Sequence, residues 1–147
     1  MNVLFLEDRG ATAYHVTRWM TENGHTVFDA YNPADAQSYW EKRAEVPVHC
    51  VILDLQTPMD GLTDDQKMEA EGGTLAGWIW YRDNVLSEVP EMRQRTIIYS
   101  DFVPVLVAKR PEEEFRGIKV ISKRQRTSAA DEVVAALKGI EKKILKQ

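Results

Sequence analysis

The chain has 147 residues, about the size of one domain, and its 44% hydrophobic and 29% charged residues exclude extensive disorder. Its formal net charge of −4 excludes a generally basic surface, so we expect no direct nucleic-acid partner. The sequence has no run of about 18 apolar residues and no basic N-terminal region of a signal peptide, so we expect a cytoplasmic protein without membrane insertion. The single cysteine, Cys50, lies in an apolar run, which fits a reducing compartment.

Five short apolar runs predict β-strands. In chain order they are Val3–Leu6, His25–Asp29, Val48–Leu53, Thr96–Tyr99 and Ile118–Ser122. The first, third and fourth lack the polar alternation of a half-exposed strand, so we expect them to be covered on both faces. The second and fifth are weaker candidates.

Segments with the helical spacing of apolar residues lie between these strands. Gly24 follows the first segment as a stop signal, and Asn32 with Pro33 begins the second as an N-cap and a first-turn proline. The helices are predicted from Ala11 to Asn23, from Pro33 to before Pro47, from Thr74 to before Pro90, and from Ser128, in a capping box with Asp131, to the lysine-rich end.

Two segments and one tryptophan do not follow this pattern. Residues 56–73 form an irregular polar stretch that is too long for an ordinary loop, and we interpret it as a functional or mobile excursion. Residues 102–116, with two prolines, allow at most a short helix. Trp80 lies off the apolar face of the third predicted helix, so we expect it to be an exposed contact point.

Strands that alternate with helices over one domain predict an α/β fold with a doubly wound parallel sheet and helices on both faces. In such sheets, ligands and reactive groups gather at the carboxyl ends of the strands. Polar residues lie at the ends of four of the predicted strands. In chain order these are Glu7 and Asp8 after the first strand, Asp54 and Gln56 after the third, Ser100 after the fourth, and Lys123 after the fifth.

Three carboxylates that converge at one edge would repel one another unless a cation lay among them, and hard oxygen ligands suit Mg²⁺. With the ion present, one carboxylate can act as a nucleophile toward a phosphoryl group. The ion, the ammonium group and the hydroxyl group then stabilise charge on the transferring oxygens. The residues therefore predict the acceptance of a phosphoryl group on an aspartate.

At these residues the sequence resembles the receiver domain of two-component response regulators, over almost the whole chain. The resemblance is carried by Leu4–Asp8, Val51–Gly61, Ile97–Ser100 and Val120–Lys123. It implies a flavodoxin-like sheet of strand order 2-1-3-4-5 in a single domain, 1–147. It also implies that Asp54 is the phosphoacceptor, that Ser100 and Lys123 contact the phosphoryl group, and that Mg²⁺ is held by Asp8, Asp54, the backbone carbonyl of Gln56 and, through water, Glu7.

The sequence departs from the receiver pattern at three places. An acidic insertion at 62–72 follows the Asp54 loop, and we expect it to border the site and to control access to it. Val120 stands where the family has an aromatic switch residue, and Arg124 replaces the proline expected after Lys123. Any rearrangement coupled to Ser100 must therefore use another side chain.

Three functions remain open from the sequence. The favoured one is a single-domain response regulator that is phosphorylated on Asp54 by a histidine kinase or phosphotransfer protein and signals through contact with a downstream protein. The second is a receiver-like adaptor that binds a partner without phosphorylation. The third and weakest is a small phosphohydrolase, because such an enzyme would need a second carboxylate where Gln56 stands.

Overall fold

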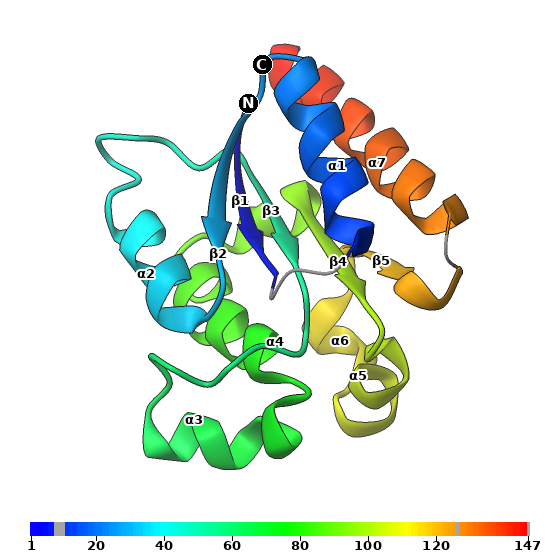
Figure 1. The fold of residues 1–147 in the computed structure, drawn as a ribbon. Coiled ribbons are helices and arrows are strands. Elements are labelled where there is room, and N and C mark those ends of the chain that lie inside the picture. The colour runs from blue at the N-terminus through cyan, green and yellow to red at the C-terminus, as the bar shows by residue number, and fades with distance from the viewer. Residues whose placement is uncertain (8–10, 126, 147) are drawn as a thin grey trace.

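The computed structural model describes residues 1–7, 11–125 and 127–146, so the predicted Mg²⁺ ligand Asp8 lies outside the described residues. Five parallel strands form one sheet in the order β2-β1-β3-β4-β5, which confirms the predicted α/β fold and strand order (Figure 1). The strands are β1 (Asn2–Leu6), β2 (Thr26–Ala30), β3 (Cys50–Leu53), β4 (Thr96–Ser100) and β5 (Lys119–Ser122).

Helices cover both faces of the sheet, as predicted (Figure 1). One face packs against α1 (Ala11–Glu22) and α7 (Thr127–Leu145). The other face packs against α2 (Pro33–Glu41) and α4 (Ala76–Tyr81), together with segments of the C-terminal half of the chain. Alternate residues of each central strand enter opposite cores, which is why these strands read as continuous apolar runs.

The start of α2 follows the predicted chemistry. Asn32 is the N-cap, and its side-chain Oδ1 accepts a hydrogen bond of 2.8 Å from the backbone N–H of Asp35. Pro33 lies in the first turn, where its missing N–H costs no helical hydrogen bond. The predicted end of this helix was too late, because the chain leaves helical geometry after Glu41.

The interpretation of residues 56–73 as irregular was wrong, because this stretch contains the helix α3 (Asp64–Glu69) followed by a 3₁₀ turn at Glu71–Gly73. Thr63 and Gln66 form a capping box, in which each side chain accepts from the other residue's backbone N–H. The insertion is anchored to the segment after α4, since Gln66 Nε2 donates to Asp83 Oδ2 at 3.0 Å and Arg82 pairs with Glu69 at 2.9 Å.

The prediction that Trp80 is an exposed contact point was also wrong. Every residue of α4 is buried, and Trp80 is 1% exposed, with its indole Nε1 donating to Gln37 Oε1 of α2 at 2.9 Å. Helix α4 contacts both α2 and the insertion helix α3, so the side of α4 that faces away from the sheet is covered as well. The sequence pattern predicted burial of only one side of this helix, whereas the structure buries both sides.

The remaining elements complete the second face. A π-helical turn (Arg82–Leu86) continues α4, and a 3₁₀ segment (Pro90–Arg95) leads into β4. Two short helices, α5 (Val103–Lys109) and α6 (Glu112–Phe115), occupy residues where we expected at most one, and Pro111 separates them as the N-cap of α6. A 3₁₀ turn (Lys123–Gln125) precedes α7, which begins at Thr127, so the predicted cap Ser128 lies inside the helix.

Over the described parts of the chain, no helix combines the length and the apolar character needed to cross a membrane.

The Cys50 thiol gives a simple probe of folding. Cys50 is completely buried on β3, and this burial raises the pKa of its thiol to about 12. We expect a thiol-specific reagent at pH 8 to leave the native protein unmodified and to react with one thiol after unfolding in urea, because the thiolate is the reactive form. The labelling is measured by absorbance. Fast labelling of the native protein would contradict the burial of this strand.

Candidate functional site

Four of the predicted site residues come together at the carboxyl edge of the sheet. Glu7 follows β1, Asp54 follows β3, Ser100 ends β4, and Lys123 follows β5. All four are almost fully buried, with exposed fractions of 6%, 5%, 0% and 9% in that order. Two carboxylates, a hydroxyl group and an ammonium group therefore share one small, nearly dry site.

The ammonium group of Lys123 bridges the two carboxylates. Its Nζ donates to Glu7 Oε2 at 2.5 Å and to Asp54 Oδ2 at 2.8 Å, and it lies 5.2 Å from the centroid of the Tyr99 ring. Burial lowers the pKa of Lys123, but the carboxylates of Asp54 and Glu7 outweigh it and leave the pKa raised. Lys123 is therefore a permanent positive charge at neutral pH.

The hydroxyl group of Ser100 holds the other oxygen of Asp54. Ser100 Oγ donates to Asp54 Oδ1 at 2.6 Å, and it accepts from the backbone N–H groups of Leu55 at 3.3 Å and Phe102 at 3.1 Å. A serine hydroxyl has one donor and two acceptor positions, so all of its hydrogen-bonding capacity is used here. Both oxygens of Asp54 are thus engaged by side chains from two other strands.

Backbone contacts fix where the Asp54 carboxylate lies. The Asp54 N–H donates to Leu6 O at 2.8 Å, and the Gly77 N–H of α4 donates to Leu55 O at 2.9 Å. A Cβ atom at Gly77 would lie 2.0 Å from Asp54 O, so only glycine allows α4 to approach the end of β3 this closely. The sequence predictions did not include Gly77, and the available signal was a glycine inside a predicted helix.

The loop after Asp54 points toward the start of α2. Gln56 is exposed, and its backbone N–H donates to Asp54 Oδ1 at 3.3 Å. Further along the loop, Asp60 O accepts from the Ala34 N–H at 2.9 Å, and Gly61 has a φ of +95° and leaves no room for a Cβ atom against Ala34. The insertion that follows is therefore held against α2 and α4.

The residues fit a divalent cation by the chemistry of their donors. Glu7 and Asp54 bring carboxylate oxygen atoms to one edge of the sheet, and hard oxygen atoms of this kind are the ligands that Mg²⁺ prefers. Within residues 1–7, 11–125 and 127–146, no group of three or more histidine, cysteine, aspartate or glutamate residues is placed to hold a metal ion. The sequence places a further carboxylate, Asp8, next to Glu7.

Val120 occupies the position expected to hold an aromatic switch residue. Its side chain is partly buried and packs against the core beneath α4, together with Phe102 and Val103. Tyr99, the other aromatic neighbour of Ser100 in the chain, is fully buried in the opposite core, beneath α1 and α7. Of the two aromatic residues beside Ser100, only Phe102 is partly exposed.

No protein-family model matches the sequence, and no curated protein matches it significantly in sequence. Solved structures match its fold. A response regulator receiver domain protein from Clostridium thermocellum gives a TM-score of 0.64 at 16% identity, covering 99% of this chain and 98% of that one. NtrX from Brucella abortus gives a TM-score of 0.63 at 16% identity. The match covers 97% of this chain but only 28% of the longer NtrX chain. The Mn²⁺-bound form of response regulator Rcp1 gives a TM-score of 0.54 at 15% identity, and the match covers 95% of this chain and 91% of that one.

The similarity extends over nearly all of this chain at low sequence identity, and the strand order agrees with it. This chain has the fold of the receiver domains of response regulators.

Proposed function

We propose that residues 1–147 act as one cytoplasmic receiver domain that accepts a phosphoryl group on Asp54 from a histidine kinase or phosphotransfer protein and signals through contact with a downstream protein. One observation carries the proposal. The buried Asp54 carboxylate has an ammonium group on one oxygen and a hydroxyl group on the other, and both donors come from neighbouring strand ends. These are the groups needed to bind the oxygens of a phosphoryl group.

In the proposed step, one carboxylate oxygen of Asp54 attacks the phosphorus of a phosphohistidine. The new O–P bond forms as the N–P bond breaks, and the electron pair stays on the imidazole nitrogen of the donor. Lys123 and Ser100 then turn their hydrogen bonds from the Asp54 carboxylate to phosphoryl oxygens. Among the described residues, Asp54 Oδ2 accepts one hydrogen bond, from Lys123, and a carboxylate oxygen has a second lone pair that can attack the phosphorus.

A divalent cation belongs to this proposal. Glu7, Asp8, Asp54 and the backbone carbonyl of Gln56 are the proposed ligands, with Mg²⁺ as the expected ion, and the Mn²⁺-bound form of Rcp1 supports a divalent ion in this fold. When bound, the ion would neutralise charge on the transferring oxygens. Lys123 would share the Glu7 and Asp54 carboxylates with the ion, with Glu7 acting through water.

The adaptor function is the second candidate, and one observation favours it. Asp54 is 5% exposed, and both of its oxygens accept hydrogen bonds from side chains, so among the described residues little of the carboxylate is open to a phosphodonor. In this alternative the Lys123 bridges would be structural, and partner binding would not change with phosphorylation. The insertion at 62–72 would then serve as part of the contact surface rather than control access to Asp54.

Intact mass spectrometry separates the two functions. We expect incubation with Mg²⁺ and acetyl phosphate to add one phosphoryl group to the wild-type protein, and we expect Asp54→Asn to add none. Asp60→Asn is the matched control, because Asp60 is an exposed aspartate in the same loop, and it should be modified like the wild type. Chelation of Mg²⁺ should abolish the modification.

No modification of the wild-type protein at saturating donor would support the adaptor and contradict the phosphoacceptor. Equal modification of the Asp54→Asn variant would show that the phosphoryl group goes elsewhere.

A further inference from the structure

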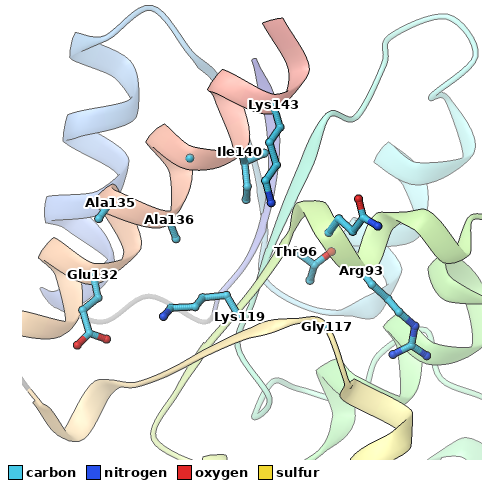
Figure 2. A pocket seen from close by; sticks show the side chains of 11 residues that line it. Arg93, Thr96, Gly117, Lys119, Glu132, Ala135, Ala136, Ile140 and Lys143 are labelled. Carbon is cyan, nitrogen blue, oxygen red and sulfur yellow. The ribbon is translucent and has the colours of Figure 1, made fainter. Parts of the chain in front are cut away.

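A basic groove lies at the opposite end of the sheet from Asp54, between α7 and the starts of β4 and β5. Its first hollow has a volume of about 480 Å³ (Figure 2). A second hollow of about 520 Å³ adjoins it and shares Gln94 and Lys143 with it. We call the two adjoining hollows together the α7 groove.

Small residues line part of the α7 groove. Ala135, Ala136 and Gly139 line it on the α7 side, and Gly117 lines it at the start of β5. Because these side chains are short, they leave open the space that larger residues would fill. In Figure 2 the side chain of Lys119 extends beneath α7 toward Glu132, and that of Lys143 descends from α7 toward Thr96.

Positive charge dominates the lining of the groove, although the whole chain has a net charge of −4. Two acidic side chains, Glu91 and Glu132, also line it. The five basic side chains are Arg93, Arg95, Lys119, Lys143 and Lys146.

Most of these charges are available to a ligand. The salt bridges between described residues use none of the five basic side chains. Arg93 donates from Nη1 to the backbone oxygens of Glu114, at 2.5 Å, and of Arg116, at 3.2 Å, so it also fixes the loop that forms one wall. Lys119, Lys143 and Lys146 are exposed.

The shape and lining of the groove select the occupant. From Glu132 to Ile144 the α7 side of the groove runs about 18 Å at 1.5 Å per residue, which is the length of an extended peptide of about five or six residues. Ile144 is partly exposed and lines the second hollow together with Lys143 and Lys146, so it would contact an apolar side chain of such a segment, whereas Ile140 is only 7% exposed. We propose that the α7 groove binds an acidic, extended segment of a partner protein, in which acidic and apolar residues alternate.

The test uses a dye-labelled peptide of alternating glutamate and leucine, about six residues long, and measures fluorescence anisotropy with the full chain. We expect saturable binding that weakens as salt increases, because rim charges contribute through screened electrostatics. The double variant Lys119→Glu/Lys143→Glu should bind roughly tenfold more weakly or worse.

The matched control is Lys138→Glu/Lys142→Glu, which makes the same change in net charge on exposed lysines of α7 that do not line the groove. It should bind within about twofold of the wild type. All four lysines are exposed, so we expect both variants to fold, and thermal melting checks this.

Three results would overturn the proposal. The first is that the wild-type protein does not bind the acidic peptide. The second is that the groove variant and the control variant lose binding equally. The third is that a single-stranded DNA of the same charge binds as tightly as the peptide, which would indicate a site for polyanions in general. Because the assay uses protein that has not met a phosphodonor, its outcome is independent of whether Asp54 is phosphorylated.

Discussion

Replacing Gly77 with alanine is expected to lower the free energy of unfolding by about 3 kcal/mol or more. The added Cβ atom would lie 2.0 Å from the backbone oxygen of Asp54 and 3.2 Å from its carbonyl carbon. Backbone atoms cannot rotate away as a flexible side chain can, so α4 must move off the end of β3. Urea denaturation followed by tryptophan fluorescence measures the loss, and the same displacement should reduce phosphoryl uptake by Asp54.

Gly139→Ala is the matched control for this substitution. Gly139 also lies in a helix, and apart from its chain neighbours and the nearby backbone of that helix, no described atom lies within 4 Å of the position that its Cβ would take. Because alanine has a higher helix propensity than glycine, we expect Gly139→Ala to raise the free energy of unfolding by up to about 1 kcal/mol. Equal effects of the two substitutions would contradict the close contact between Gly77 and Asp54.

Replacing Lys123 with methionine is expected to cost about 3 kcal/mol of stability in the absence of divalent ions. The variant keeps the length of the side chain but removes the ammonium group that pairs with two buried carboxylates. Two nearly buried carboxylates would then both lose the ammonium group that they share. The measurement is urea denaturation at pH 7 in the presence of a chelator.

A second substitution tests whether the loss comes from the two buried carboxylates. Glu7→Gln in the Lys123→Met background removes one of the two carboxylates, and it should restore about 1 kcal/mol or more. Lys142→Met serves as the control for loss of a lysine, because Lys142 is exposed and should change stability by less than about 0.5 kcal/mol. A Lys123→Met variant as stable as this control would mean that the Lys123 bridges carry no net stability.

The parallel sheet could be predicted because local and global signals agree, and its strand order was implied by the resemblance to receiver domains. Strands β1, β3 and β4 are apolar on both faces, and the chain alternates them with helices whose caps, such as Asn32, are visible in the sequence. The burial of Trp80 could not be predicted in this way. It depends on α3, a helix in an insertion that packs over α4, and no periodicity within α4 reveals that second contact.

The sequence predicted four residues of the candidate site that the structure brings together, but it did not predict the contacts among them. Parallel strands bring their carboxyl ends to one edge, so the order of the polar residues was enough to place Glu7, Asp54, Ser100 and Lys123 together. That one ammonium group would bridge carboxylates from two strands depends on register and side-chain packing across the sheet. The close approach of Gly77 likewise depends on how α4 packs against the end of β3.

The central claim is that Asp54 itself carries the phosphoryl group. Treatment of the phosphorylated protein with borohydride reduces an aspartyl phosphate to homoserine, and tandem mass spectrometry of the resulting peptides locates the change. We predict homoserine at position 54 only in protein that has been incubated with both Mg²⁺ and the phosphodonor. An unaltered aspartate at position 54, with the phosphoryl group on another residue or on none, would contradict the claim.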